Sequence, residues 1–272
     1  LGTALEDVRV VAPDTDSAPE SGPTVGSRSL TLMGNAILLA AQPIKESLML
    51  SAAELLETTV ERLVARDRFI YDPDNPGEKL ALKEAARRCM LTGRRMIGQG
   101  WYTPPKATLD PKTGQGNPYF VYTYATQMAE VEVDMRTGEV TVKRMAAAFD
   151  IGKAINPMLL EGQIDGGIGM GVGYALLEKV ILDKGVIQNL DFRNYLIPTS
   201  LDVPKIDATL LEMANVHGPF GAKGIGEMPN IPTPATINNA IANAIGARIF
   251  ELPIDSESVW RAIRGAAAKC TV

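Results

Sequence analysis

The spacing of hydrophobic residues divides the chain into stretches with helical periodicity and stretches that alternate like strands. Between Leu30 and Leu63, apolar residues recur at intervals of three and four, which predicts a long helix that Pro43 should kink or restart. The same periodicity predicts further helices over 77–90, 157–177, 233–245 and 256–267.

Alternation of apolar and polar residues indicates the strands. They are predicted over 8–11, 119–133, 140–149 and 208–213, with a further hairpin over 180–187. The turn Arg136–Glu139 joins two of these strands into a hairpin. Because strands and helices mix without regular βα alternation, the pattern predicts an α+β fold with mixed sheets and packed helices.

Proline and glycine mark the ends of the predicted helices and a joint within the chain. Asn156-Pro157 and Thr233-Pro234 each place a cap residue before a proline, and Gly246 is expected to end its helix. The stretch 104–118 holds four prolines and two glycines. We therefore expect a long loop there, or a joint between lobes 1–103 and 119–272.

Composition narrows the function classes. The 272 residues are 46% hydrophobic and 22% charged with a net charge of −5, so nothing favours nucleic acid as the main partner. No apolar run approaches the ~20 residues that span a bilayer, and the start of the chain does not resemble a signal peptide. We expect a cytoplasmic protein with two reduced thiols, Cys89 and Cys270, too few with the single His217 for a zinc or iron–sulfur site.

Two glycine-containing segments could bind a ligand. Gly162, Gly166, Gly169 and Gly173 form one stripe of a predicted helix, which either packs tightly against another element or contacts a cofactor, with Gln163 beside it for hydrogen bonds. The segment Gly26-Ser27-Arg28-Ser29 precedes the long helix, where backbone N–H groups can bind an anion. Ser29 is equally an ordinary helix cap.

A third segment, His217–Pro229, has four glycines within nine residues and ends in Glu227-Met228-Pro229. It is not a Walker loop, since no Gly-Lys-Ser/Thr follows. Glu227 would suit general-base chemistry if it were buried. From spacing alone, an ion pair between Glu227 and Lys223 on a solvated loop is the more ordinary interpretation.

Three segments in this order resemble one family. The first comprises Asp14-Thr15-Asp16 and Gly26–Ser29, and the second comprises Asp150-Ile151-Gly152, Ile155-Asn156-Pro157 and Gly162–Gly167. The third comprises Gly221–Glu227 and the helix ending Gly246-Ala247-Arg248. All three are similar to signatures of the molybdopterin-binding subunit of the xanthine dehydrogenase/aldehyde oxidase family. The resemblance runs from about residue 6 to residue 264. It implies the mixed α+β fold of that family's molybdopterin-binding domain.

The resemblance also implies roles for single residues. Glu227 matches the base that deprotonates the molybdenum-bound hydroxyl, and Met228 departs from the proline common after it. The positions that match contacts to the pterin or its phosphate are Gly26, Ser27, Arg28, Ser29, Gln163, Lys223, Gly224 and Ile225. No residue is expected to bind the metal directly, because the pterin dithiolene holds it. The cofactor is expected to be molybdopterin with molybdenum, with or without a cytosine dinucleotide.

The family's subunit is much longer, and its remaining metal and substrate contacts would lie upstream of Leu1. We therefore expect either the second half of a split subunit or a fragment, partnered by the N-terminal half, a [2Fe–2S] subunit and an FAD subunit. The implied reaction oxidises an N-heterocycle or aldehyde, with water as the oxygen source. The alternatives are a non-catalytic structural subunit, or a carbon monoxide dehydrogenase or aryl-CoA reductase of the same family.

Overall fold

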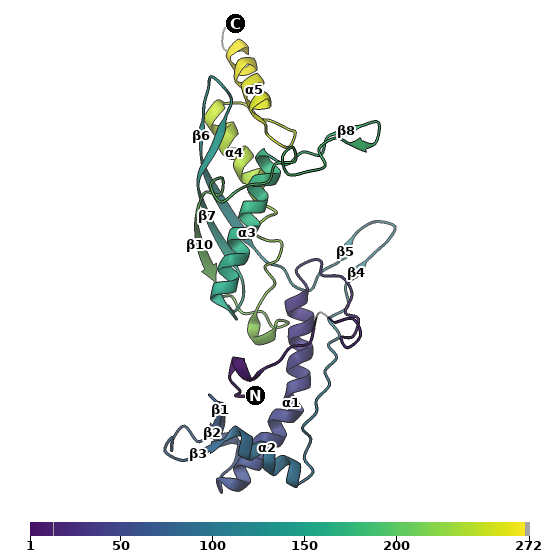
Figure 1. Cartoon of the computed structure of the whole chain (residues 1–272), viewed down its shortest axis with the longest axis vertical. Coiled ribbons are helices and arrows are strands. Elements are labelled where there is room, and N and C mark those ends of the chain that lie inside the picture. Colours follow the sequence, from purple (N-terminus) through teal and green to yellow (C-terminus); the bar gives the residue numbers. More distant parts are fainter. Residues whose placement is uncertain (13, 270–272) are drawn as a thin grey trace. The chain divides into compact units, whose positions relative to one another are not determined.

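The computed structural model describes residues 1–12 and 14–269, so Cys270 lies outside the described residues. The chain divides into two compact units, Leu1–Lys106 and Ala107–Val272, each with its own hydrophobic core (Figure 1). The boundary lies within the Pro/Gly-rich stretch 104–118. Within the described part, no helix is long and apolar enough to cross a membrane.

The first unit is built around one long helix. Its elements in order are η1 (Leu5–Asp7), α1 (Ser29–Leu55), η2 (Val60–Arg62), β1 (Val64–Arg66), β2 (Phe69–Tyr71), β3 (Lys79–Ala81) and α2 (Leu82–Leu91). The three strands pair antiparallel in the order β1-β2-β3. Ala52 of α1, Ile70 of β2, and Ala85 and Cys89 of α2 are fully buried where these elements meet.

Helix α1 ends eight residues before the predicted end at Leu63. Glu57 adopts a left-handed conformation with φ of 49°, and the Thr58 N–H donates to the Ala53 carbonyl at 3.0 Å, the bond that closes a Schellman motif. Pro43 lies inside the helix, which neither ends nor restarts there. Helix periodicity alone does not mark such an end, because apolar residues continue beyond it.

Two further expectations for the first unit are wrong. Residues 8–11 form no strand, and Val10 is 75% exposed, so the run has no sheet to pack on. The helix predicted from residue 77 begins at Leu82, because Lys79–Ala81 pair with β2 as strand β3.

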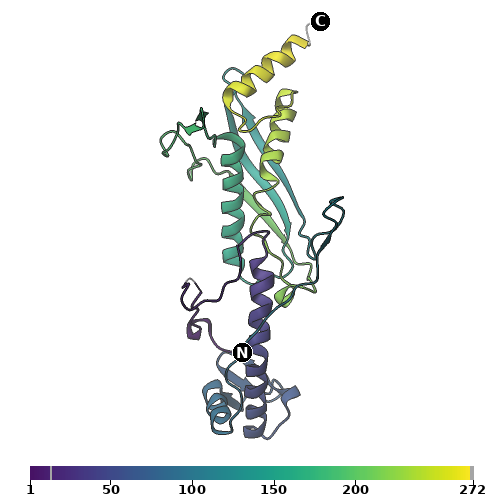
Figure 2. The same cartoon turned by 90° about the vertical axis from the view of Figure 1, so that its right-hand side faces the viewer.

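The second unit is a three-stranded sheet, of order β10-β7-β6, with helices on one face (Figure 2). Strands β6 (Ala125–Val133) and β7 (Val140–Asp150) form the predicted hairpin, although residues 119–124, predicted as part of its first strand, form none. Strand β10 (Lys205–Leu211) pairs parallel with β7. Helices α3 (Pro157–Leu176) and α4 (Thr233–Ile245) pack on the sheet, and α5 (Ser256–Lys269) follows. Two small hairpins complete the unit, β4 (Thr108–Leu109) with β5 (Gly116–Asn117) and β8 (Leu182–Asp183) with β9 (Val186–Ile187). This arrangement confirms the α+β prediction.

The core of the second unit lies between the sheet and the two helices. Its fully buried side chains include Met145 and Phe149 from β7, Ile164 and Ile168 from α3, and Ile237 and Ile241 from α4. The predicted cap at Asn156 is confirmed, because its side chain accepts the Leu159 N–H at 3.1 Å. Gly246 ends α4 as expected, with φ of 71°. Thr233, however, is the first helical residue rather than the cap, which is Pro232.

The backbone of helix α3 packs directly against the side chains of Pro229 and Thr233, at the start of α4. A Cβ at Gly167 would lie 2.7 Å from Pro229 Cβ, and one at Gly171 would lie 2.4 Å from Thr233 Cβ. Real Cβ atoms do not approach so closely, so these two glycines are required by helix packing.

The predicted stripe divides in two. Gly169 and Gly173 are packed inside the unit, against Val203 and Pro198, whereas Gly162 and Gly166 have open space beside them. Tight packing therefore explains the second half of the stripe, and the first half presents bare backbone at the surface.

We predict opposite effects for two alanine substitutions in α3. Gly171→Ala should lower the free energy of unfolding by about 1–3 kcal/mol, because Thr233 must be displaced. Gly162→Ala should raise it by up to ~1 kcal/mol, because alanine favours helix and meets nothing. Denaturant unfolding of the two variants measures both values, and equal effects would contradict the packing assignment.

Candidate functional site

The loop that carries Glu227 is attached to the end of strand β7. The Lys223 N–H donates to the Ile151 carbonyl at 2.9 Å, and the Lys153 N–H donates to the Gly221 carbonyl at 3.2 Å. Gly152, between them, has φ of 64°, and a Cβ there would lie 2.1 Å from the Gly221 carbonyl oxygen. Only glycine allows this approach. The motif Asp150-Ile151-Gly152 and the motif Gly221–Glu227 are therefore joined by backbone hydrogen bonds.

A buried ion pair joins the same two segments. Lys223 Nζ lies 2.5 Å from Asp150 Oδ2, and the two side chains are 11% and 7% exposed. The ammonium also donates to the Tyr122 carbonyl at 3.2 Å and lies 6.0 Å from the centre of the Tyr124 ring. Sequence spacing suggested Glu227 as the partner of Lys223; the structure pairs Lys223 with Asp150, 73 residues upstream.

Gln163 connects helix α3 to the residue before Glu227. Its side-chain Nε2 donates to the Gly226 carbonyl at 3.2 Å. Gln163 is exposed, as are Gly162 and Gly166 in the same two turns of α3. The open part of the glycine stripe therefore adjoins the loop of Glu227.

Glu227 begins the turn that leads into α4. Its carbonyl accepts the N–H groups of Asn230 and Ile231, both at 3.1 Å, while the residue as a whole is exposed. The described residues therefore do not bury the Glu227 carboxylate, and burial is what would suit it to act as a general base. Its neighbours Gly224 and Ile225 are half-buried, and their backbone N–H groups donate to no backbone carbonyl among the described residues.

The far end of this turn is held by Gln127, which sequence reasoning missed. Gln127 Nε2 donates to the Pro229 carbonyl at 2.8 Å, and the buried Thr233 hydroxyl lies 2.8 Å from both Gln127 Oε1 and the Pro229 oxygen. The signal was present in the pattern, because Gln127 shares the inward face of β6 with Ala129 and Val131. A polar residue at such a position needs a hydrogen-bonding partner.

The segment Gly26–Ser29 belongs to the other unit. Gly26 and Ser27 are left-handed, with φ of 61° and 52°, and Arg28 returns to the right-handed region as the N-cap of α1. The Arg28 N–H donates to the Val25 carbonyl at 3.3 Å, and the segment lies next to the N-terminus of α1, where backbone N–H groups can bind an anion. Ser29 is the first helical residue rather than the cap, and Arg28 Nη2 donates to the Ser21 carbonyl at 2.8 Å. The structure thus groups Gln163, Lys223, Gly224, Ile225 and Glu227 in the second unit, apart from residues 26–29.

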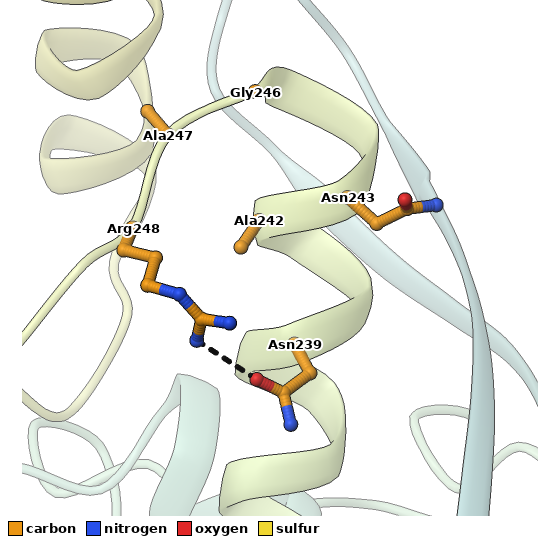
Figure 3. Close-up of a pocket in the computed structure, with 6 residues that line it drawn as sticks. All are labelled: Asn239, Ala242, Asn243, Gly246, Ala247 and Arg248. Carbon is orange, nitrogen blue, oxygen red and sulfur yellow. Dashed lines mark hydrogen bonds between the residues drawn. The ribbon is translucent and has the colours of Figure 1, made fainter.

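A polar cavity of about 490 Å³ lies at the other end of α4 (Figure 3). Arg248 Nη1 donates to Asn239 Oδ1 there, at 2.9 Å, and Gly246 forms part of the wall. Arg248 follows the C-terminus of α4, where a cation complements the helix dipole. None of the predicted site residues lines this cavity.

Near Asp150, an exposed ion pair joins Lys153 to Glu212, with Nζ and Oε2 2.7 Å apart. The Ala154 N–H donates to the same carboxylate at 2.9 Å. The Lys153 ammonium and this N–H hold the pKa of Glu212 below its ordinary value of 4.5.

Comparisons with known proteins place the chain in a family. Residues 1–204 match the family model of the molybdopterin cofactor-binding domain. The aldehyde oxidoreductase of Megalodesulfovibrio gigas is 33% identical over 97% of this chain and 26% of its own length. The xanthine dehydrogenase molybdenum-binding subunit of Escherichia coli O157:H7 is 31% identical over 96% of this chain and 34% of its own. The reconstituted CO dehydrogenase structure from Oligotropha carboxidovorans superimposes with a TM-score of 0.76 at 26% identity, over 94% of this chain and 31% of that one.

The fold and the sequence together define a molybdopterin cofactor-binding domain. The chain belongs to the xanthine dehydrogenase/aldehyde oxidase family of molybdenum-binding subunits. It spans about a quarter to a third of the length of the relatives it matches.

We predict that Thr233→Val will destabilise the protein. The substitution keeps the shape but leaves Gln127 Oε1 without its donor, at a cost of about 1–3 kcal/mol in unfolding free energy. Thr209→Val, at an exposed position of β10, should change stability by no more than ~0.5 kcal/mol. Chemical denaturation compares the two, and an unaltered Thr233→Val protein would show that Gln127 does not hold the turn.

A pH dependence follows from Glu212. Because its folded pKa is lowered, its stabilising contribution is present above pH 4.5 and is lost as pH falls through the folded value. The difference in unfolding free energy between wild type and Glu212→Gln should therefore shrink between about pH 6 and pH 3. Denaturant titrations across this range test the sign; a difference that grew on acidification would refute it.

Proposed function

We propose that this chain is the molybdenum cofactor-binding component of a hydroxylase or dehydrogenase, with Glu227 as its catalytic base. The observation that carries the proposal is the hydrogen bond between Gln163 and the Gly226 carbonyl. Through it, Glu227, the open backbone of α3 and the N–H groups of Gly224 and Ile225 belong to one surface. The family membership of the chain supports the same assignment.

The residues on this surface suit a pterin. A pterin ring presents several hydrogen-bonding groups on one edge, and Gln163 can donate and accept there while its other N–H stays on Gly226. Gly162 and Gly166 leave room for a flat group against the helix backbone. The N–H groups of Gly224 and Ile225 add two donors. In the first unit, the segment Gly26–Ser29 at the N-terminus of α1 is the candidate for binding a phosphate, such as that of a mononucleotide or cytosine dinucleotide form, although the Arg28 N–H already donates to the Val25 carbonyl at 3.3 Å.

When bound, the cofactor supplies the two-electron redox chemistry. The part of this chain is to bind and orient it and to move a proton. Glu227 is exposed on a loop whose backbone is fixed at Lys223, Gly226 and Pro229, so its carboxylate can reach a group bound at this surface. We propose that Glu227 takes a proton as oxygen is transferred to an electron-poor carbon of an N-heterocycle or aldehyde, with water as the oxygen source.

The remaining components follow from the same proposal. The relatives are three to four times longer than this chain, so the N-terminal part of the molybdenum subunit would complete the site and shield Glu227 from water. Electrons would leave through [2Fe–2S] and FAD centres on partner chains. A second candidate is carbon monoxide oxidation, favoured by the structural similarity to CO dehydrogenase. A third is a non-catalytic subunit in which Glu227 only starts the turn into α4.

We predict that Glu227→Gln in the assembled enzyme will slow anaerobic reduction by substrate at least ~10²-fold, because a positioned base typically contributes ~10²–10⁴. This corresponds to about 2.7 kcal/mol of activation free energy. Molybdenum content should remain near wild type, since the amide has the same size and the backbone contacts of residue 227 are kept. Stopped-flow rates normalised to bound molybdenum provide the measurement.

Glu139→Gln is the matched control, because Glu139 precedes β7 at the end of the strand opposite Asp150. Its rate should equal that of wild type. A loss below tenfold in Glu227→Gln at full molybdenum occupancy would reject the base assignment and favour the non-catalytic alternative.

A further inference from the structure

We propose that Asp150 is a positioning residue, which holds the Glu227 loop in place through its ion pair with Lys223. The inference rests on the proposed role of Glu227, and it gives Lys223 a different task from the cofactor contact implied by family resemblance. Asp150 lies at the end of β7 and Lys223 lies four residues before Glu227. Their ion pair is the most deeply buried one among the described residues.

The surroundings of Lys223 favour this role over ligand binding. Its ammonium has three N–H donors, of which one is directed to Asp150 at 2.5 Å and another to the Tyr122 carbonyl at 3.2 Å. The Tyr124 ring lies on a further side, and only 11% of the side chain is exposed. A cation arranged in this way fixes the backbone that carries it and has little surface to offer to a cofactor.

The backbone shows what the ion pair fixes. Lys223 N–H binds the Ile151 carbonyl, and Gly224 and Ile225 follow without backbone bonds of their own among the described residues. The next attachment is Gly226, through Gln163. The position of the segment between Lys223 and Gly226 therefore depends on its two ends. Releasing the Lys223 end would weaken the hydrogen bond from its N–H to the Ile151 carbonyl and displace Gly224, Ile225 and the start of the Glu227 turn.

The test compares three variants of the assembled enzyme, Asp150→Asn, Lys223→Gln and the double variant. Each should lower kcat about 10- to 100-fold, since small displacements of a catalytic group have effects of that size. Cofactor content and KM should stay within about twofold of wild type. The double variant should be no slower than the slower single variant, because both singles remove one shared interaction. The double variant removes both charges and therefore leaves no unpaired buried charge. Its kcat tests the positioning of the loop even if a single variant folds poorly.

Hydrogen exchange supplies a readout that does not depend on turnover. In cofactor-free and loaded protein alike, the amides of residues 222 and 223, which donate to the Pro219 and Ile151 carbonyls, should exchange at least about tenfold faster in all three variants. Glu212→Gln is the control, because it breaks a neighbouring ion pair that is exposed. It should leave both kcat and these exchange rates unchanged.

Two results would overturn the proposal. One is wild-type exchange and kcat in the double variant. The other is loss of cofactor in Lys223→Gln with full retention in Asp150→Asn, which would make Lys223 a cofactor ligand. If Glu227→Gln keeps its rate while the amides of Asp150→Asn exchange faster, the base assignment fails and the positioning of the loop stands. If Glu227→Gln is slow and the double variant is not, only the positioning role fails.

Discussion

The close approach of helix α3 to the turn Pro229–Thr233 determines the geometry of the second unit. Gly167 and Gly171 carry no side chain, so the backbone of α3 lies directly against the side chains of Pro229 and Thr233. This contact brings Gln163, one turn earlier on α3, within hydrogen-bonding distance of Gly226. A packing requirement in the core thus sets where the surface loop with Glu227 must lie.

The candidate site is held at its ends and open at its centre. On one side Asp150 and Lys223 form a largely buried ion pair, and on the other side Gln127 and Thr233 hydrogen-bond to the Pro229 carbonyl. Glu227 itself is exposed between them. Because the backbone is fixed on both sides, the Glu227 carboxylate has a limited range of positions. Its chemical environment is set by the group that binds at this surface.

Much of the fold could be predicted from local signals, whereas most of the site could not. The β6–β7 hairpin and α3 have clear turn and cap residues, so the hairpin turn and the start of α3 agreed with the structure, whereas the strand predicted from residue 119 begins at Ala125. The end of α1 was missed because a non-glycine residue, Glu57, adopts the left-handed conformation there. Asp150 and Lys223 both lie in motifs that carry the family resemblance, but the resemblance did not reveal their ion pair. A contact between residues so distant in sequence leaves no periodic pattern in the sequence. Gln127 was detectable only once the inward face of β6 was known.

The long separation between Asp150 and Lys223 has a consequence for how the chain folds. The β6–β7 hairpin and the first turns of α3 need only neighbouring residues, whereas β10 joins β7 in parallel and the ion pair spans 73 positions. Closing a loop of that length costs about 4 kcal/mol of chain entropy by the logarithmic rule, and it is repaid only when the long-range contacts form. The hairpin can therefore form before the Asp150–Lys223 ion pair, which requires the longer loop to close.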